Sequence, residues 1–138
     1  MAEDAAGHQN HFIAMEYIHG QTFAEVLRKE GVSQGEKLRM LEDAARAVAF
    51  AHSRGVIHRD LKPANILVDN RDHVFLTDFG LARAESFTTR LTRSKTIMGT
   101  PQYMAPEQVE GRVKDIDARS DVYALGVILY ETLVGTLP

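Results

Sequence analysis

The most regular alternation of hydrophobic and polar positions in this chain lies between residues 34 and 53. Side chains that can face a core recur there at helical spacing: Leu38, Leu41, Ala45, Val48, Ala49 and His52. Ser33 precedes the run and Glu36 follows three residues later, which is the form of a capping box. Gly55 then provides a stop signal. The pattern predicts a helix over about residues 34–53.

The N-terminal part of the chain shows shorter patterns. Residues 1–10 are small and polar, and we expect a frayed end there. Residues 12–18 have the composition of a strand, with a turn at His19-Gly20. From Thr22 onward a helix is predicted, which Gly31 would end and whose apolar face is Phe23, Val26 and Leu27.

The remaining patterns predict a hairpin, a loop and a second long helix. Residues 66–68 and 74–76 are apolar and the stretch between them has a turn composition, so we predict a hairpin over 66–76. Residues 81–100 are polar, and a loop of this length in a compact domain is usually functional or disordered. Ser120-Asp121 has the form of a cap for a helix reaching about Val134. That helix is apolar nearly all round and should need burial on every side.

Composition narrows the class of protein. A chain of 138 residues with 44% hydrophobic and 25% charged residues is expected to form one domain. A net charge of -3 argues against a nucleic-acid partner, and the absence of cysteine excludes disulfides and thiolate metal sites. The first twenty residues lack a secretory signal, and the apolar stretch Val122–Val134 is too short for a bilayer. We expect a cytoplasmic protein, although a membrane anchor outside this segment would not conflict with that expectation.

One charged stretch, residues 58–65, joins the long helix to the predicted hairpin. It contains His, Arg, Asp, Lys and Asn within eight positions. Asp78-Phe79-Gly80 follows thirteen residues after Asn65, and Ala105-Pro106-Glu107 comes later. Taken singly, each aspartate would be read as a solvated turn carboxylate. In this order and at these separations, the three motifs indicate phosphoryl transfer.

The chain resembles the central part of a eukaryotic-type serine/threonine protein kinase, with a bacterial character. The motifs that carry the resemblance are HRDLKPAN at 58–65, DFG at 78–80, GTPQYMAPE at 99–107 and DVYALG at 121–126. The resemblance covers residues 11–138 and implies an α+β fold. It predicts a protein-kinase-like C-lobe that is mainly α-helical, with short β-hairpins at the catalytic and magnesium loops and most of the N-lobe sheet absent.

The same resemblance predicts the division of the chain. A partial kinase domain would span residues 1–138, with a disordered end at 1–10 and a hinge strand at 11–20. Residues 21–138 would form a partial C-lobe that contains the activation segment, 78–107.

The resemblance also assigns the chemistry of transfer. Asp60 would accept the proton of the substrate hydroxyl as general base, and Lys62 would meet the transferring phosphate. Asn65 and Asp78 would supply the oxygen ligands that magnesium prefers. The implied cofactors are ATP and Mg2+, and the implied partner is a protein substrate with a serine or threonine. The oligomeric state is not predicted.

The early strand would form the adenine site. Met15 would be the gatekeeper, the Glu16 carbonyl and the Ile18 backbone would meet the adenine edge, and Thr22 would contact the ribose. Leu67 would close the pocket from below, although it is equally well explained as a core leucine of a strand.

Regulatory roles follow from the resemblance in the activation segment. Arg59 would pair with a phosphate on that segment, using its bidentate guanidinium group. Thr96 is the preferred phosphosite by its distance to Gly99-Thr100, with Thr92 and Ser94 behind it. Thr100 would hydrogen-bond Asp60 and Lys62, a combination that favours serine and threonine over tyrosine substrates.

Structural roles are implied for four further residues. His58 would pack against Phe79, and Glu107 would pair with an arginine far downstream of these residues. Asp121 would accept backbone N–H bonds from the catalytic loop, or it would be a plain helix cap, and the two roles are compatible.

Two functions are compatible with these residues, and the intact Asp60 and Asp78 favour the first. The first is an active serine/threonine kinase. The second is a truncated, inactive kinase fragment that acts at most as a binding or scaffolding module. The glycine-rich loop, the lysine and its glutamate partner that the family places before the hinge are not among these residues. We therefore expect weak or no activity from these residues alone.

Overall fold

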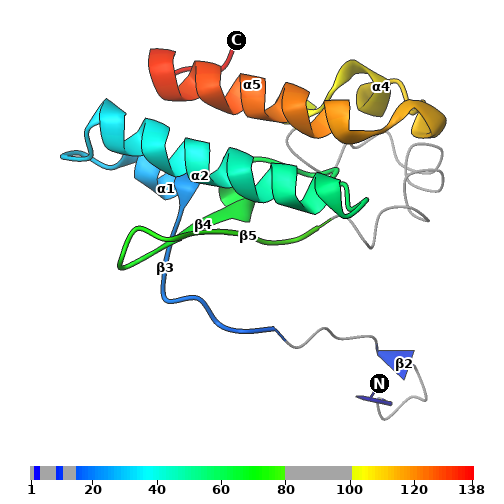
Figure 1. Cartoon of the computed structure of the whole chain (residues 1–138), viewed down its shortest axis with the longest axis horizontal. Coiled ribbons are helices and arrows are strands. Elements are labelled where there is room, and N and C mark those ends of the chain that lie inside the picture. Colours follow the sequence, from blue (N-terminus) through cyan, green and yellow to red (C-terminus); the bar gives the residue numbers. More distant parts are fainter. Residues whose placement is uncertain (1, 4–8, 11–14, 80–100) are drawn as a thin grey trace.

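The computed structural model describes residues 2–3, 9–10, 15–79 and 101–138 (Figure 1). Its α-helices are α1 (Phe23–Arg28), α2 (Gln34–Ser53), α4 (Pro106–Val109) and α5 (Ala118–Val134). Its strands are β1 (Ala2–Glu3), β2 (Gln9–Asn10), β3 (Gly20–Thr22), β4 (Ile66–Asp69) and β5 (Val74–Leu76). Single 3-10 turns lie at Pro63–Asn65, Pro101–Tyr103 and Val113–Asp115. The mainly helical α+β class is as predicted.

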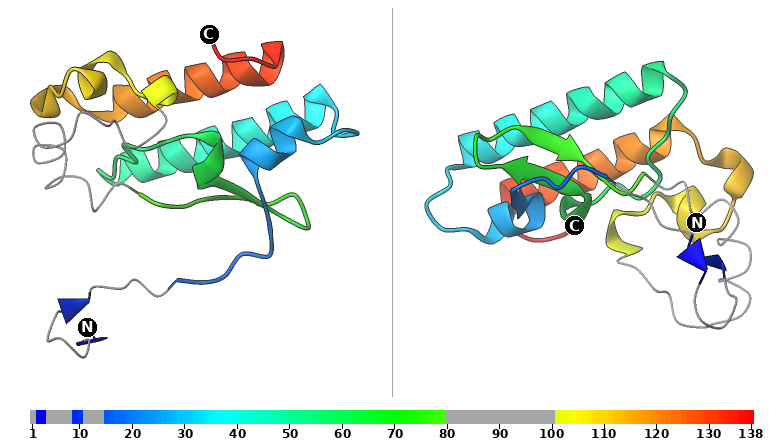
Figure 2. Two further views of the ribbon diagram at one scale, coloured as in Figure 1. Left: turned by 180° about the vertical axis from the view of Figure 1, so that it is seen from behind. Right: turned by 90° about the horizontal axis from the view of Figure 1, so that it is seen from below.

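Two long helices and a small sheet form successive layers. Helices α2 and α5 lie side by side and run in opposite directions, and the sheet lies on the other side of α2 (Figures 1 and 2). The sheet is antiparallel in the order β3-β4-β5. The catalytic-motif stretch, residues 58–65, connects α2 to β4 and therefore lies where these layers meet.

Helix α2 begins and ends as the sequence predicts. The Ser33 hydroxyl accepts a hydrogen bond from the Glu36 N–H (3.2 Å), and the Glu36 carboxylate accepts one from the Ser33 N–H (2.8 Å). These bonds satisfy donors that the first turn leaves without helical partners. The Ser33 hydroxyl also donates to the Glu36 carboxylate at 2.6 Å, and this bond together with that from the Ser33 N–H lowers the pKa of Glu36. The buried stripe is Met40, Leu41, Ala44 and Val48, so the predicted Ala49 lies outside it.

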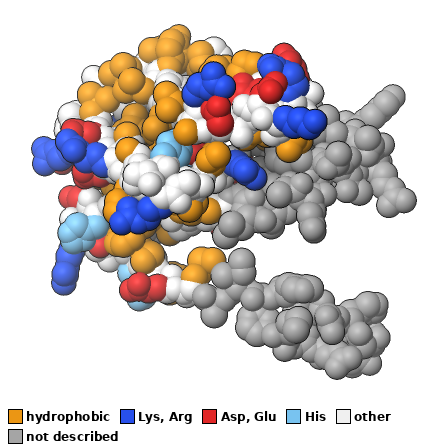
Figure 3. Space-filling model, turned by 45° about the vertical axis from the view of Figure 1, so that its right-hand side comes forward, with side chains coloured by type: hydrophobic (Ala, Val, Ile, Leu, Met, Phe, Trp, Pro, Cys, Tyr) orange, Lys and Arg blue, Asp and Glu red, His pale blue; other side chains and the backbone are white. Residues whose placement is uncertain are grey.

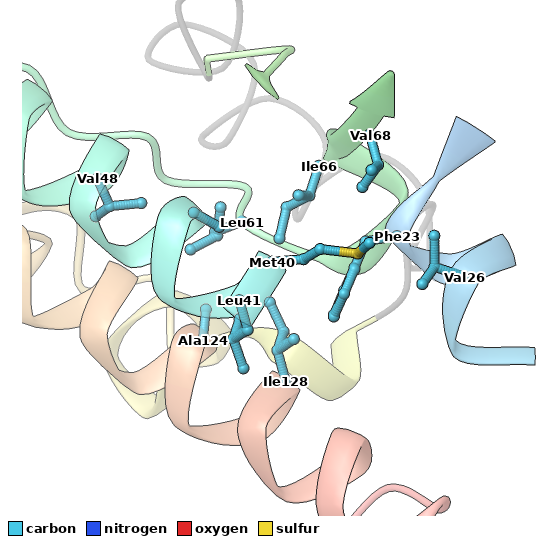
Figure 4. Packing of buried hydrophobic residues seen from close by; sticks show 11 residues of the cluster. Phe23, Val26, Met40, Leu41, Val48, Leu61, Ile66, Val68, Ala124 and Ile128 are labelled. Carbon is cyan, nitrogen blue, oxygen red and sulfur yellow. The ribbon is translucent and has the colours of Figure 1, made fainter. Parts of the chain in front are cut away.

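The hydrophobic core lies between α2, α5 and the sheet. Figure 4 shows Met40 and Leu41 of α2 between the β4 side chains and those of α5. Phe23 of α1, Ile66 of β4 and Ile128 of α5 are each fully buried. Burying such side chains contributes about 1.5–3 kcal/mol apiece, which makes this cluster the main stabilising contact between the layers.

The predicted hairpin over 66–76 is confirmed, whereas the predicted strand before it is wrong in the part that is described. Residues 15–19 are irregular, and the strand is β3, where a turn was expected. Gly20 explains the difference. A Cβ at Gly20 would lie 2.0 Å from the Val68 carbonyl oxygen, so only glycine allows this backbone to approach β4 closely enough to pair.

Helix ends differ from the sequence prediction at two places. Helix α1 ends at Arg28, before the predicted stop at Gly31. Helix α5 begins at Ala118, because the Asp117 carboxylate caps it by accepting the Arg119 N–H at 2.8 Å. Ser120 lies inside the first turn and is buried rather than being the cap.

Within the predicted frayed end, the described residues of β1 and β2 form a short antiparallel pair.

The expectation that α5 is buried on every side is corrected. Helix α5 is buried on one face only, where α2 packs against it. The other face is exposed: Val122, Tyr123, Leu129, Tyr130, Leu133 and Val134. Figure 3 shows hydrophobic side chains gathered along the top of the molecule, where α5 lies. Among the described helices, none has the length and hydropathy that a membrane crossing requires.

Candidate active site

A buried carboxylate of α5 holds the catalytic-motif stretch. The Asp121 side chain accepts hydrogen bonds from the His58 N–H and the Arg59 N–H, each at 2.8 Å. Asp121 is only 1% exposed, and a buried charge is costly unless its oxygens are hydrogen-bonded. The two bonds are those that the kinase resemblance leads us to expect at this position.

A third bond to Asp121 comes from a residue whose role the sequence did not suggest. His52 Nε2 lies 2.7 Å from Asp121 Oδ2 and ties the last turn of α2 to α5. His52 had appeared only as a member of the apolar helical stripe. The sequence did offer one signal for this role: a histidine on the apolar stripe, in the turn that leads into a charged loop.

The backbone at Arg59 is strained and held from both sides. Its φ is 67°, a left-handed value that costs about 1–3 kcal/mol for a residue other than glycine. Its N–H is bound by Asp121, and its carbonyl accepts a hydrogen bond from Gln108 Nε2 of α4 at 2.7 Å. The guanidinium Nε is buried and has no hydrogen-bond partner among the described residues. The sequence did not single out Gln108 either.

Asp60 is oriented by two neighbours from the same stretch. Lys62 Nζ lies 3.0 Å from Asp60 Oδ2, and Asn65 Nδ2 lies 3.2 Å from the same oxygen. Asn65 Nδ2 also donates to the Asp60 carbonyl at 2.7 Å. Both atoms that Nδ2 contacts are acceptor oxygens, so this end of the Asn65 amide must be the NH2 group, and Oδ1 faces the opposite way. The structure therefore brings the three predicted transfer residues together in one contact group.

The His58 side chain makes contacts that stabilise the fold. Nε2 lies 2.9 Å from the Thr77 carbonyl, so this nitrogen carries the proton of the neutral ring. Burial lowers the pKa of His58, and the ring packs on Phe79 with centroids 4.5 Å apart. These contacts suit a structural role rather than that of a proton carrier.

Asp78 is held near residues 58–65 through the residue that precedes it. The Thr77 N–H donates to the Asn65 carbonyl at 3.0 Å, which joins the residue before Asp78 to the residue that ends the catalytic-motif stretch. Asp78 is exposed and has a φ of 57°, again left-handed. One carboxylate and one amide oxygen fit Mg2+, which keeps several waters and is completed by substrate phosphates rather than by a full protein cage. Among the described residues, no group of three His, Cys, Asp or Glu side chains could hold a metal by itself.

A cleft of about 380 Å³ lies beside β3 and β4. All the residues predicted for the adenine site line it: Met15, Glu16, Ile18, Thr22 and Leu67. Thr22 is fixed there as the cap of α1, because its N–H and hydroxyl both donate to the Glu25 carboxylate, at 2.7 and 2.9 Å. Met15, the predicted gatekeeper, is 65% exposed.

The predicted regulatory hydroxyls, those of Thr92, Ser94, Thr96 and Thr100, lie outside the described residues. Glu107 is described, and its carboxylate accepts a hydrogen bond from the Ser120 hydroxyl of α5, which lowers the pKa of Glu107. This bond joins the Ala-Pro-Glu motif to α5.

Comparison with known proteins agrees with this geometry. Residues 1–138 match the protein kinase domain family. The chain is 42% identical over 128 residues to the serine/threonine-protein kinase PknB of Mycobacterium leprae, covering 92% of this chain and 20% of that protein. It is 45% identical over 135 residues to the serine/threonine-protein kinase pkn3 of Myxococcus xanthus, covering 92% and 24%. It is 40% identical over 136 residues to PknA of Corynebacterium glutamicum, covering 98% and 28%.

The chain therefore spans between 20% and 28% of the length of these relatives. A match over all of its residues, together with these identities, is sufficient to assign the family. This chain belongs to the protein kinase domain family, and its relatives are serine/threonine kinases.

Proposed function

We propose that this chain is the catalytic segment of a serine/threonine protein kinase, which transfers the γ-phosphate of ATP to a serine or threonine hydroxyl of a protein. The observation that supports this most is the contact group of Asp60, Lys62 and Asn65 on a loop anchored by Asp121. Phosphoryl transfer depends on positioning and on cations more than on covalent chemistry, and this group offers both.

Each member of the group has a distinct role in the proposal. Asp60 accepts the proton of the attacking hydroxyl, and its carboxylate is held in place by the Asn65 amide. Lys62 lies beside Asp60 as a point charge that can meet the transferring phosphate. In this proposal the Thr100 hydroxyl favours serine and threonine substrates over tyrosine.

Asn65 and Asp78 would hold Mg2+, the first through Oδ1 and the second through its exposed carboxylate. The ion would neutralise phosphate charge and orient the triphosphate. The cleft beside β3 would take the adenine and ribose, with Glu16 and Ile18 offering backbone groups and Leu67 an apolar surface. Arg59, whose guanidinium has a buried N–H without a partner in the described structure, would meet a phosphate on Thr96.

The test is a transfer assay on the purified full-length gene product with Mg-ATP and a serine- and threonine-containing peptide. Asp60→Asn is expected to lower kcat by at least about 100-fold, the scale of general-base catalysis. Asp72→Asn is the matched control, since Asp72 lies in the exposed hairpin turn with a φ of 64°, which asparagine also tolerates. Equal rates for the Asp60 variant and its control would refute the proposal and favour a binding module without catalysis.

A further inference from the structure

Gln108 forms a buried bridge that neither the sequence motifs nor the proposed chemistry requires. It is the third residue of α4 and is 4% exposed. Its Oε1 accepts the Ala105 N–H at 3.0 Å, and its Nε2 donates to the Arg59 carbonyl at 2.7 Å. One side chain thus joins the Ala-Pro-Glu motif to the catalytic loop across 49 residues of sequence.

Helix capping explains only one of these two bonds. A glutamine at the third helical position commonly reaches back to the N–H of the residue before the helix, as Oε1 does here. Nothing in capping calls for the second bond. A donor is needed on that side because the Arg59 carbonyl is an acceptor, so the position requires an amide rather than a carboxylate.

The bond falls on the peptide immediately before Asp60. The Arg59 carbonyl belongs to the peptide group that joins Arg59 to Asp60, and that group is planar. With the Arg59 N–H held by Asp121 and the carbonyl held by Gln108, the left-handed backbone at Arg59 is fixed at both of its polar atoms. The direction in which the Asp60 side chain leaves the backbone follows from that plane.

We infer that Gln108 is a positioning residue for phosphoryl transfer, which sets the orientation of Asp60 through the Arg59 carbonyl. This inference rests on the proposed role of Asp60 as general base. Removing the bond releases the peptide plane, and a misplacement of about 1 Å remote from the chemistry can cost about 100-fold in rate. The loss is expected in kcat rather than in nucleotide affinity, since Gln108 does not line the cleft beside β3.

Two substitutions separate positioning from capping. Gln108→Glu keeps an acceptor for the Ala105 N–H, and glutamate is a preferred residue at this point of a capping box. It replaces the donor to Arg59 by an oxygen. Gln108→Met keeps the length of the side chain and removes both bonds. Gln34→Glu is the matched control, because Gln34 also donates to a backbone carbonyl, that of Leu133, but is exposed at the far end of α2.

In the full-length gene product, both Gln108 variants are expected to lower kcat by about 10- to 100-fold, with the KM for ATP within about twofold of wild type. The deficit of Gln108→Glu should narrow between about pH 8 and about pH 6, because a protonated carboxyl can again donate to Arg59. Burial and the carboxylates of Asp60 and Asp121, which face the same small cavity, favour that protonation, whereas Arg59 and Lys62 oppose it. Each rate is divided by the wild-type rate at the same pH.

A Gln108→Glu protein that melts like wild type and turns over within about twofold of wild type at every pH would overturn the inference. A deficit of Gln108→Glu that does not change with pH and that comes with a lower melting temperature would also overturn it, because that pattern indicates a structural defect alone. If Gln108→Met fails to fold, Gln108→Glu still decides, since the cap is retained. The proposed function is tested separately: Asp60→Asn lowers kcat by at least about 100-fold if the function holds, whether or not Gln108 positions that residue.

Discussion

Asp121→Asn offers the sharpest test of how residues 58–65, the proposed catalytic loop, are held. The carboxylate accepts three hydrogen bonds, from the His58 N–H, the Arg59 N–H and His52 Nε2. Asparagine has the same shape but only one oxygen, so its NH2 group must face at least one of these donors. The less costly orientation places the NH2 against the Arg59 N–H and keeps the oxygen for the two histidines.

The magnitude follows from what that orientation loses. A hydrogen bond to a charged acceptor contributes about 1.5–3 kcal/mol, and a buried N–H left without an acceptor costs about 1–3 kcal/mol. The two terms overlap, because one lost contact gives rise to both, so we expect a loss of about 2–4 kcal/mol in the free energy of unfolding. Loss of the anchor beside Asp60 should lower kcat as well.

Chemical denaturation followed by far-ultraviolet circular dichroism measures this change, since the described residues are largely helical and the chain has no tryptophan. Asp117→Asn is the matched control in the same helix. Asp117 is the half-buried cap of α5, where asparagine serves as well as aspartate, and its ion-pair partner Arg119 is exposed. The control should change stability by less than about 1 kcal/mol. An equally small effect of Asp121→Asn would refute the reasoning that this carboxylate holds the loop.

Three further changes test other parts of the structure. Gly20→Ala should destabilise the protein by about 1–3 kcal/mol in thermal unfolding, because the added Cβ would clash with the backbone of β4. The comparison variant Gly126→Ala, whose Cβ would point into open space on α5, should stabilise the protein by about 0.5–1 kcal/mol. Burial lowers the pKa of His58, so the unfolded chain binds the proton first as the pH falls below about 6.5, and the stability of the fold declines there. The denaturation midpoint of the His58→Phe variant should decline less steeply over this pH range, and an unchanged slope would count against that account. Asp78→Asn should raise the Mg2+ concentration needed for binding of a fluorescent ATP analogue by about tenfold or more, measured without any transfer, while Asp72→Asn should leave it unchanged.

Short-range sequence patterns predicted the elements that contacts between nearby residues stabilise. The capping box at Ser33 and the helical stripe behind it define α2 almost to the residue, and the turn at 69–72 defines the hairpin. Where the prediction failed, a distant contact decided the outcome. The strand β3 forms where a glycine lets the chain approach Val68, and no pattern within the first twenty residues reveals that partner.

The site shows the same division. The motifs predicted Asp60, Lys62 and Asn65 as site residues; they lie within six residues of one another, and the structure shows them in one contact group. His52 and Gln108 were missed because their roles depend on partners 69 and 49 residues away. Periodicity could say that His52 faces inward, but it could not say that a carboxylate would be there.

The anchoring of the loop by Asp121 has a consequence for the order of folding. The hydrogen bonds to His58 and Arg59 span 63 and 62 residues, so they close long loops and cannot form until α5 has been synthesised and has docked on α2. The backbone hydrogen bonds of helix α2 and of the hairpin are local and can form earlier. We therefore expect residues 58–65 to reach their final geometry last, so that a nascent chain that already carries every residue of the motif would not yet hold Asp60 in place.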